Sequence, residues 1–118
     1  MKIKHFTEVK KEEVTAYGST DTEIRWLITK EDGAPRFALR RFVIHPKGQV
    51  GLHGHPEEHE IYILQGKARV FNDKGEEVIA EEGNVLYVPP DEPHGYENVG
   101  SEDFVFLCVI PYLNKAKK

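Results

Sequence analysis

The sequence lacks the cysteines needed for disulfide bonds and the long apolar runs needed for membrane-spanning segments. It contains one cysteine, Cys108, so no disulfide can form within the chain. It has no N-terminal apolar stretch typical of a signal peptide, and no apolar run approaches the roughly 18 residues that cross a membrane. We therefore expect a soluble, cytoplasmic protein with no membrane partner.

Positive charge is also scarce. Lysine and arginine number 16 against 20 aspartate and glutamate residues, which gives a net charge of −4. The one local basic run is Lys115, Lys117 and Lys118, which we interpret as a solvated chain end. Phosphate binding requires clustered basic side chains, so we do not expect nucleic acid as a partner.

The chain is instead rich in short apolar runs that alternate with Gly, Pro, Asp and Asn, a pattern typical of an all-β protein. Its 118 residues suit one domain, with no internal repeat or linker. Residues 7–14 are dense in Lys and Glu and are expected to form one or two helical turns. Strands are predicted at residues 23–29, 37–45, 60–64, 67–72, 76–80, 85–88, 94–98 and 103–110.

Many short strands at this spacing favour a sandwich or a barrel, including the jelly-roll arrangement. Pro46-Lys47-Gly48 is predicted to end the second strand. The last strand is apolar at every position from 104 to 110, which indicates burial on both faces. One face would line the barrel, and the other would meet a second sheet or a second subunit. We therefore expect a homodimer.

Four of the six histidines form the candidate chemical centre. His53 and His55 lie two residues apart, so an extended backbone places both on one face. His59 follows a short turn and shares its strand face with Ile61 and Ile63. His94 comes much later, after a proline-rich turn, and two antiparallel excursions of the chain would return it to the first three.

These segments resemble the two sequence motifs of the cupin superfamily. The first motif runs from Gly48 through His53-Gly54-His55 and His59 to Gly66, and the second runs from Gly83 through Pro89-Pro90-Asp91 and His94 to Asn98. Asp91 stands where the family usually has glycine. His59 stands where the family usually has a glutamate ligand, because the spacing to Gly66 fits His59 and does not fit Glu60.

The resemblance implies a single jelly-roll cupin barrel of two antiparallel sheets over residues 1–118, with metal motifs at 48–66 and 83–98. The pattern is similar to small single-domain cupins of thermophiles with a four-histidine, manganese-type site. It implies one divalent transition-metal ion bound by His53, His55, His59 and His94.

The chemistry of imidazole limits which ion such a site would take. Imidazole suits Mn, Fe, Co, Ni, Cu and Zn, and it does not suit Mg or Ca. Four neutral ligands leave the full charge of the ion in place and leave two octahedral positions open for a small molecule. Two alternatives stay open: a closed structural site, which usually contains cysteine, and a histidine cluster without metal.

The walls of the pocket are assigned by strand alternation. Tyr96 shares a face with His94, and Val50 precedes the first ligands. Phe106 and Cys108 would cover the open metal positions if the last strand has the matching phase. Arg40 would anchor a substrate carboxylate if it, rather than Arg41, faces the interior. For each residue the alternative is ordinary core packing or a surface salt bridge.

Three functions remain compatible with an open transition-metal site. The first, which we expect ahead of the other two, is a dioxygenase-type oxidoreductase acting on a small organic substrate. The second is an isomerase or lyase that uses the ion as a Lewis acid on a sugar-like or keto-acid substrate. The third is a metabolite- or metal-binding module without turnover. The fold does not choose among them, and no catalytic residue is assigned from the spacing.

Overall fold

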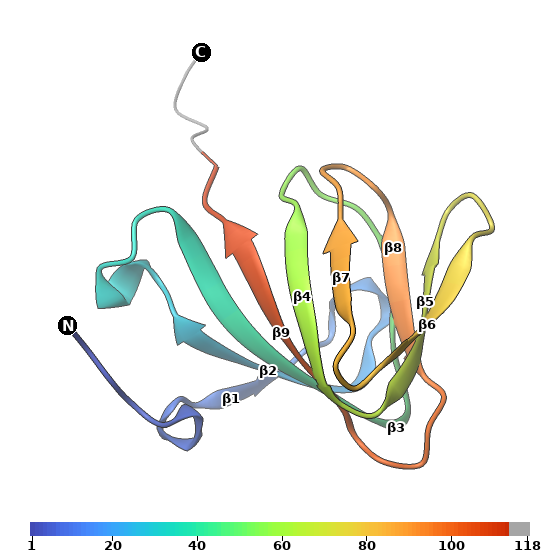
Figure 1. Ribbon diagram of the computed structural model, residues 1–118, viewed down its shortest axis with the longest axis horizontal. Helices are drawn as coiled ribbons and strands as arrows, with labels where there is room; N and C mark the ends of the chain where they lie inside the picture. Colours follow the sequence, from blue (N-terminus) through green and yellow to red (C-terminus); the bar gives the residue numbers. More distant parts are fainter. Residues whose placement is uncertain (114–118) are drawn as a thin grey trace.

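The structure is a computed structural model that describes residues 1–113, so the basic run Lys115, Lys117 and Lys118 lies outside the described residues. Nine antiparallel strands curl into a nearly closed barrel (Figure 1), which confirms the predicted all-β class. Single 3-10 turns lie at η1 (Phe6–Glu8), η2 (Ala16–Gly18) and η3 (Lys30–Asp32). The strands are β1 (Lys11–Glu13), β2 (Thr20–Ile28), β3 (Phe37–His53), β4 (His59–Gln65), β5 (Lys67–Asn72), β6 (Glu77–Glu81), β7 (Val85–Val88), β8 (His94–Asn98) and β9 (Phe104–Pro111).

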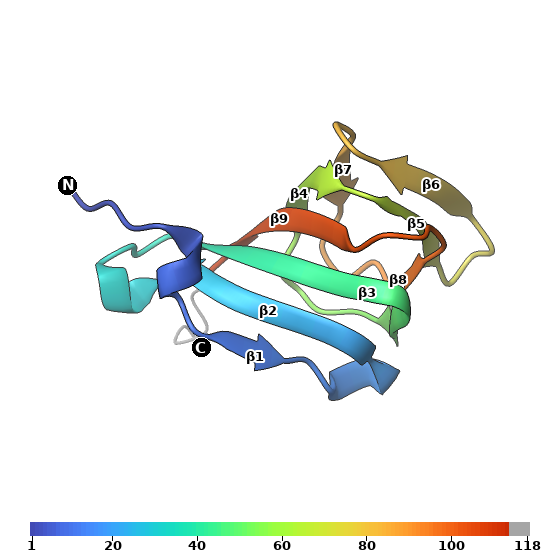
Figure 2. The same cartoon turned by 90° about the horizontal axis from the view of Figure 1, so that it is seen from below.

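Strand β3 is long enough to belong to both layers of the barrel. The strand order is β6-β5-β8-β3-β9-β4-β7, with β2 and then β1 added beside β3. The first part of β3 pairs with β2 and β9, and its second part pairs with β8. The two expected sheets are therefore joined through β3 into one continuous hydrogen-bonded sheet. Figure 2 shows β1, β2, β3 and β9 lying in that order along one side.

The prediction that Pro46-Lys47-Gly48 ends a strand is wrong. The strand bends at this point and continues to His53. Lys47 takes a φ of 72°, which absorbs the bend, and Gly48 allows β2 to approach closely. A Cβ at Gly48 would lie 2.8 Å from the carbonyl oxygen of Thr20. The turn-forming residues therefore mark the place where β3 changes its partner from β9 to β8.

The prediction of helical turns across residues 7–14 is also wrong for most of that segment. Only the short turn η1 touches it, and Lys11–Glu13 pairs with β2 as strand β1. The backbone of β2 offers unpaired N–H and C=O groups along this edge, and satisfying them outweighs the weak helical preference of lysine and glutamate.

The core lies between the two layers and is built from alternate residues of each strand. Ile61 and Ile63 of β4 and Phe104 and Phe106 of β9 are each at most 3% exposed. The intervening residue Tyr62 points outward and is half exposed. The alternation places one face of β4 and β9 in the barrel, where the four histidines also lie.

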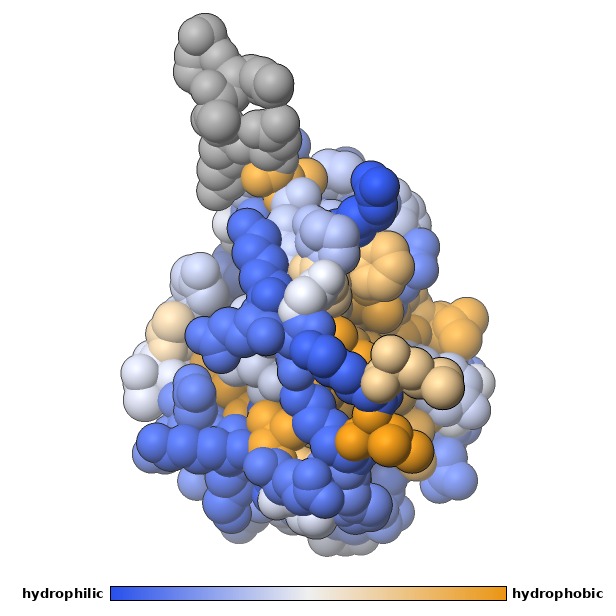
Figure 3. Space-filling view, turned by 90° about the vertical axis from the view of Figure 1, so that its left-hand side faces the viewer, coloured by the Kyte–Doolittle hydropathy of each residue, from blue (hydrophilic) through white to orange (hydrophobic). Residues whose placement is uncertain are grey.

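The side of the molecule that carries the N-terminal segment has a different character. A groove of about 760 Å³ is lined there by Met1, Ile3, Phe6 and Leu27 among others, and it contains none of the predicted site residues. Figure 3 shows this side, with apolar side chains exposed between hydrophilic ones. None of the helical segments in residues 1–113 has the length and apolar character needed to span a membrane.

Candidate metal centre

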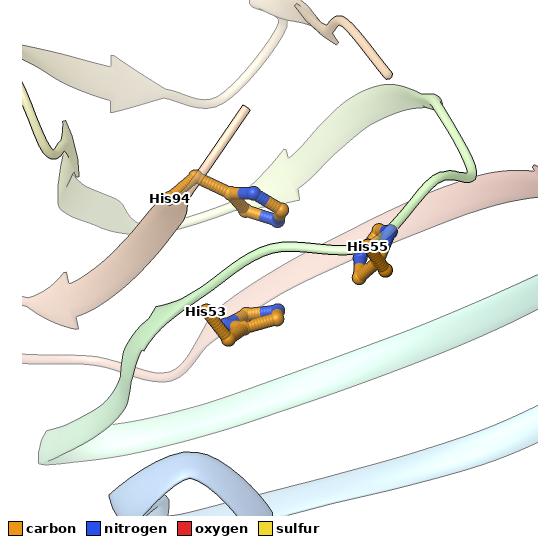
Figure 4. Close-up of side chains that lie close together, drawn as sticks. All are labelled: His53, His55 and His94. Carbon is orange, nitrogen blue, oxygen red and sulfur yellow. The ribbon is translucent and has the colours of Figure 1, made fainter. Parts of the chain in front are cut away.

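The four histidines come from three strand ends and one loop that meet at the same end of the barrel. His53 closes β3, His59 opens β4, His94 opens β8, and His55 lies in the loop between β3 and β4. The register of β3 and β8 pairs His53 directly with His94. Ligand nitrogens of His53, His55 and His94 all lie within 4.8 Å of one another, and their rings converge in Figure 4.

Backbone carbonyl groups fix the orientation of these three rings. The Nδ1 atoms lie 2.8 Å from Gly51 O for His53, 2.9 Å from Glu57 O for His55, and 2.9 Å from Glu92 O for His94. A carbonyl oxygen only accepts hydrogen bonds, so each Nδ1 carries the proton. Each Nε2 therefore carries no proton, and this is the tautomer that a metal ion requires.

Burial favours the neutral form of two of these imidazoles, His53 and His94. His94 is 2% exposed, and its Nε2 atom is buried without a hydrogen-bond partner among the described residues. Desolvation lowers the pKa of His94 to about 4. Desolvation also lowers the pKa of His53, with smaller contributions from His55 and then from the charge on Arg40. A buried lone pair without a donor is costly in a metal-free protein and is suited to binding a cation.

His59 is held differently from the other three. Its Nε2 atom lies 2.8 Å from His55 Nε2, and its Nδ1 atom lies 3.1 Å from both Arg40 Nη2 and Cys108 Sγ. Arginine only donates, so without metal the Nδ1 of His59 accepts and its Nε2 carries the proton that points at His55. Desolvation, followed by the charge on Arg40, lowers the pKa of His59 to about 2.

The four residues fit a transition-metal ion. The Nε2 atoms of His55 and His59 lie 2.8 Å apart, so both could bind one ion placed between them and the other two imidazoles. A metal on His59 Nε2 would move the proton to Nδ1, so Arg40 would no longer donate to that nitrogen, and the sulfur of Cys108 would accept its proton instead. His53, His55 and His94 form the cluster of mutually close ligand nitrogens, and a fourth bond from His59 is part of the proposal made below.

A cavity of about 310 Å³ lies against the histidines, and all five predicted wall residues line it. Phe106 and Cys108 are 1% exposed, which sets the phase of β9. Tyr96 stacks against Phe106 with ring centroids 5.3 Å apart, and burial raises its pKa. The remaining two predicted wall residues are Arg40 and Val50.

The sequence left open which of two neighbouring arginines faces inward. Arg40 lines the cavity, and Arg41 lies on the opposite face of β3 above the ring of Phe6. His5 and His45, which lie outside the motifs, are remote from the cavity. The His45 ring contacts the Asp103 carboxylate at 2.8 Å, and this contact raises the pKa of His45.

Sequence reasoning missed several residues of the cavity, and Tyr17 is the most notable. Its ring stacks on His53 with centroids 4.3 Å apart and an interplanar angle of 11°. Tyr17 takes a φ of 58°, and no periodicity or spacing in the sequence signals that position. The other wall residues not predicted as such are Val14, Ile24, Phe42, Glu57 and Ile110.

Two residues of the second motif, Asp91 and Asn98, have clear structural roles. Asp91 takes a φ of 66°, so it supplies the left-handed backbone for which the family normally uses glycine. Asn98 is buried, and its side-chain nitrogen donates to Ile44 O and Glu102 O. These contacts fix the loop after β8 and hence the position of His94 at the other end of that strand.

Comparison with known proteins identifies the family. A model described as a cupin domain matches residues 40–110, which is more than half of the chain and includes all four histidines. The chain belongs to the cupin family. The predicted cupin jelly-roll fold is thereby confirmed.

Several cupins are similar over most of their length. The oxalate-binding protein of Thermotoga maritima is 38% identical over 96 residues, which cover 79% of this chain and 78% of the relative. The polyketide cyclase RemF from Streptomyces resistomycificus shares 35% identity with a TM-score of 0.88, covering 98% of this chain and 88% of that one. A predicted oxalate decarboxylase from Thermotoga maritima shares 29% identity with a TM-score of 0.83, covering 95% and 100%.

Proposed function

We propose that this cupin is a metal-dependent enzyme that binds one divalent transition-metal ion through His53, His55, His59 and His94. Its substrate is a small organic molecule with oxygen donors, held in the adjoining cavity. The observation that carries the proposal is the set of tethered imidazoles. Three rings are fixed through Nδ1 so that their Nε2 lone pairs converge, and the buried Nε2 of His94 has no partner among the described residues.

The chemistry we favour is Lewis-acid catalysis. A bound ion at this place would polarise an oxygen of the substrate. The chain's own residues orient the imidazoles, exclude water with aromatic walls, and leave a cavity of about 310 Å³ beside them. The similar proteins named for a polyketide cyclase and for oxalate support a substrate rich in carbonyl or carboxylate oxygen.

A dioxygenase-type reaction is the second candidate. It is supported by the apolar character of the cavity, where Phe42 and Phe106 stack with centroids 4.9 Å apart. Such walls suit an aromatic or alkene-like substrate. A binding module without turnover is the third candidate, and the same experiment separates all three. Manganese is the ion that the resemblance to four-histidine cupins favours, and any of the other imidazole-binding ions fits the same ligands.

The test begins with the metal. The protein is purified without added metal, its bound ion is identified by mass spectrometry, and the loaded protein is incubated with small keto acids, catechols and diketones. Turnover that needs the metal and consumes no oxygen supports the proposal. Oxygen uptake with turnover supports the second candidate. Tight binding without turnover supports the module, and a protein that takes up no transition metal contradicts the proposal and the second candidate.

A further inference from the structure

Arg40 is a buried cation without a counter-charge. Its side chain is 8% exposed, yet none of the ion pairs formed by the described residues involves it. Its Nε atom is buried and has no hydrogen-bond partner within residues 1–113. Burying a charged group without a partner is expensive, so an unpaired guanidinium in a cavity wall needs an explanation.

The contacts that Arg40 does make are with neutral or weakly polar groups. Nη2 lies 3.0 Å from Cys108 Sγ and 3.1 Å from His59 Nδ1. The guanidinium carbon lies 5.3 Å from the ring centroid of Trp26 and 5.0 Å from that of Phe42. These contacts hold the guanidinium in place against the cavity, and none of them neutralises its charge.

The one acidic side chain in the cavity wall does not fill this role. Glu57 lines the same cavity, but its carboxylate lies on the side of His55, 3.6 Å from that ring. With a divalent ion bound, the cavity would carry a clear excess of positive charge. Charge complementarity therefore calls for an anionic ligand.

We propose that Arg40 is the anion-binding pole of the site, and that the ligand is a small carboxylate with a second oxygen donor, such as a 2-hydroxy or 2-oxo acid. The inference rests on the proposed function, because the second oxygen takes the open metal position while the carboxylate pairs with Arg40. Arg40 Nη2 contacts the Nδ1 atom of His59, and the Nε2 atom of the same ring would bind the metal. Arg40 and the histidines also line the same cavity. A single small molecule can therefore reach both poles.

Arg40 also couples the two binding events. Its charge lies 3.1 Å from a ligand imidazole and repels a metal cation. A bound carboxylate neutralises that charge, so carboxylate and metal each strengthen the binding of the other, as linkage requires. Replacing Arg40 with a neutral side chain therefore weakens carboxylate binding while leaving metal binding unchanged or tighter. A purely structural arginine would produce the opposite pattern, with weaker metal binding and a less stable fold.

The test compares a carboxylate with its neutral isostere. Salicylate and salicylamide are titrated calorimetrically into the manganese-loaded protein in buffer free of carboxylate and phosphate. Wild type is expected to prefer salicylate by about 10- to 100-fold, the range for a hydrogen bond to a charged group. Arg40→Met should lose this preference, and Arg40→Lys should keep part of it. Arg41→Met, a change on the opposite face, should keep it fully.

Metal affinity measured on the same proteins separates the possible failures. An equal preference in wild type and Arg40→Met, or no salicylate binding by a fully loaded wild type, would overturn the role of Arg40 and leave the metal proposal intact. Weaker metal binding in Arg40→Met together with a lowered melting temperature would also overturn it in favour of a structural role. A wild-type protein that takes up no metal would overturn the proposed function itself.

Discussion

The neutral histidines at the centre predict that mild acid destabilises the metal-free protein. At pH 5.5 both His94, with a pKa of about 4, and His59, with a pKa of about 2, remain uncharged in the folded chain. In the unfolded chain a histidine has a pKa near 6.5 and is mostly protonated at that pH. The unfolded chain then binds more protons, so the free energy of unfolding falls as the pH drops below 6.5.

The size of the effect follows from these pKa values. Each of the two histidines lowers the free energy of unfolding by about 1.5 kcal/mol between pH 6.5 and pH 5, so the pair lowers it by roughly 3 kcal/mol. A domain of this kind has only about 5–15 kcal/mol of stability in total. His45 acts in the opposite sense, because the Asp103 carboxylate raises its pKa. Its contribution is present below pH 6.5 and is lost as the pH rises through its raised pKa.

Urea denaturation of the chelator-treated protein at pH 6.5 and pH 5.0 measures this loss. His94→Gln removes one of the two titrating groups and should reduce the loss by about half. His5→Gln, a change at an exposed histidine, is the matched control and should leave the loss unchanged. A loss below about 1 kcal/mol in the wild type, or one that His94→Gln does not alter, would refute the account of a buried neutral cluster.

Three further outcomes are expected. His94→Ala should weaken metal affinity, measured by competition with a chelator, by about 100- to 1,000-fold, because it removes one of four ligands and its share of the binding free energy. His45→Ala, a change outside the cavity, should leave the affinity unchanged in the same assay. Gly66→Ala should destabilise the fold by about 3 kcal/mol, because φ is +89° and the added Cβ would collide with the carbonyl oxygen of Asp103. Gly75→Ala, where φ is +82° and the space is open, should cost only about 1 kcal/mol, as measured by urea denaturation. The half-exposed Tyr87 lies on an apolar outer face, and we expect two chains to associate through this face as a homodimer. Tyr87→Arg should therefore yield monomers in sedimentation equilibrium. A monomeric wild type at micromolar concentration would contradict this expectation.

Local sequence signals sufficed for some strands and failed for others. Strands β5, β7 and β8 have the predicted bounds, because glycine, proline or asparagine turns close them on both sides. Strand β1 was missed, since only pairing with β2 makes that charged segment extended. The continuation of β3 past Pro46 was missed because it depends on a change of partner strand, which no local pattern encodes.

The candidate site shows the same division. The four histidines were selectable because their spacing within two motifs is a one-dimensional signal, and the structure brings them to one end of the barrel. The direction of Arg40 needed the phase of β3, which alternation alone left ambiguous. Tyr17 stacks on His53 from a separate turn, so its place depends on tertiary packing that the sequence pattern does not show.

The central claim is that four imidazoles from separate parts of the chain bind one cation that keeps open positions. A crystal structure with manganese, recorded at a wavelength that gives anomalous signal from the metal, tests this most directly. We expect one ion per chain, bound through Nε2 of His53, His55, His59 and His94, with water or a small anion at the remaining positions. An ion bound elsewhere, or one from which His59 is turned away, or one sealed by further side chains, would contradict the claim.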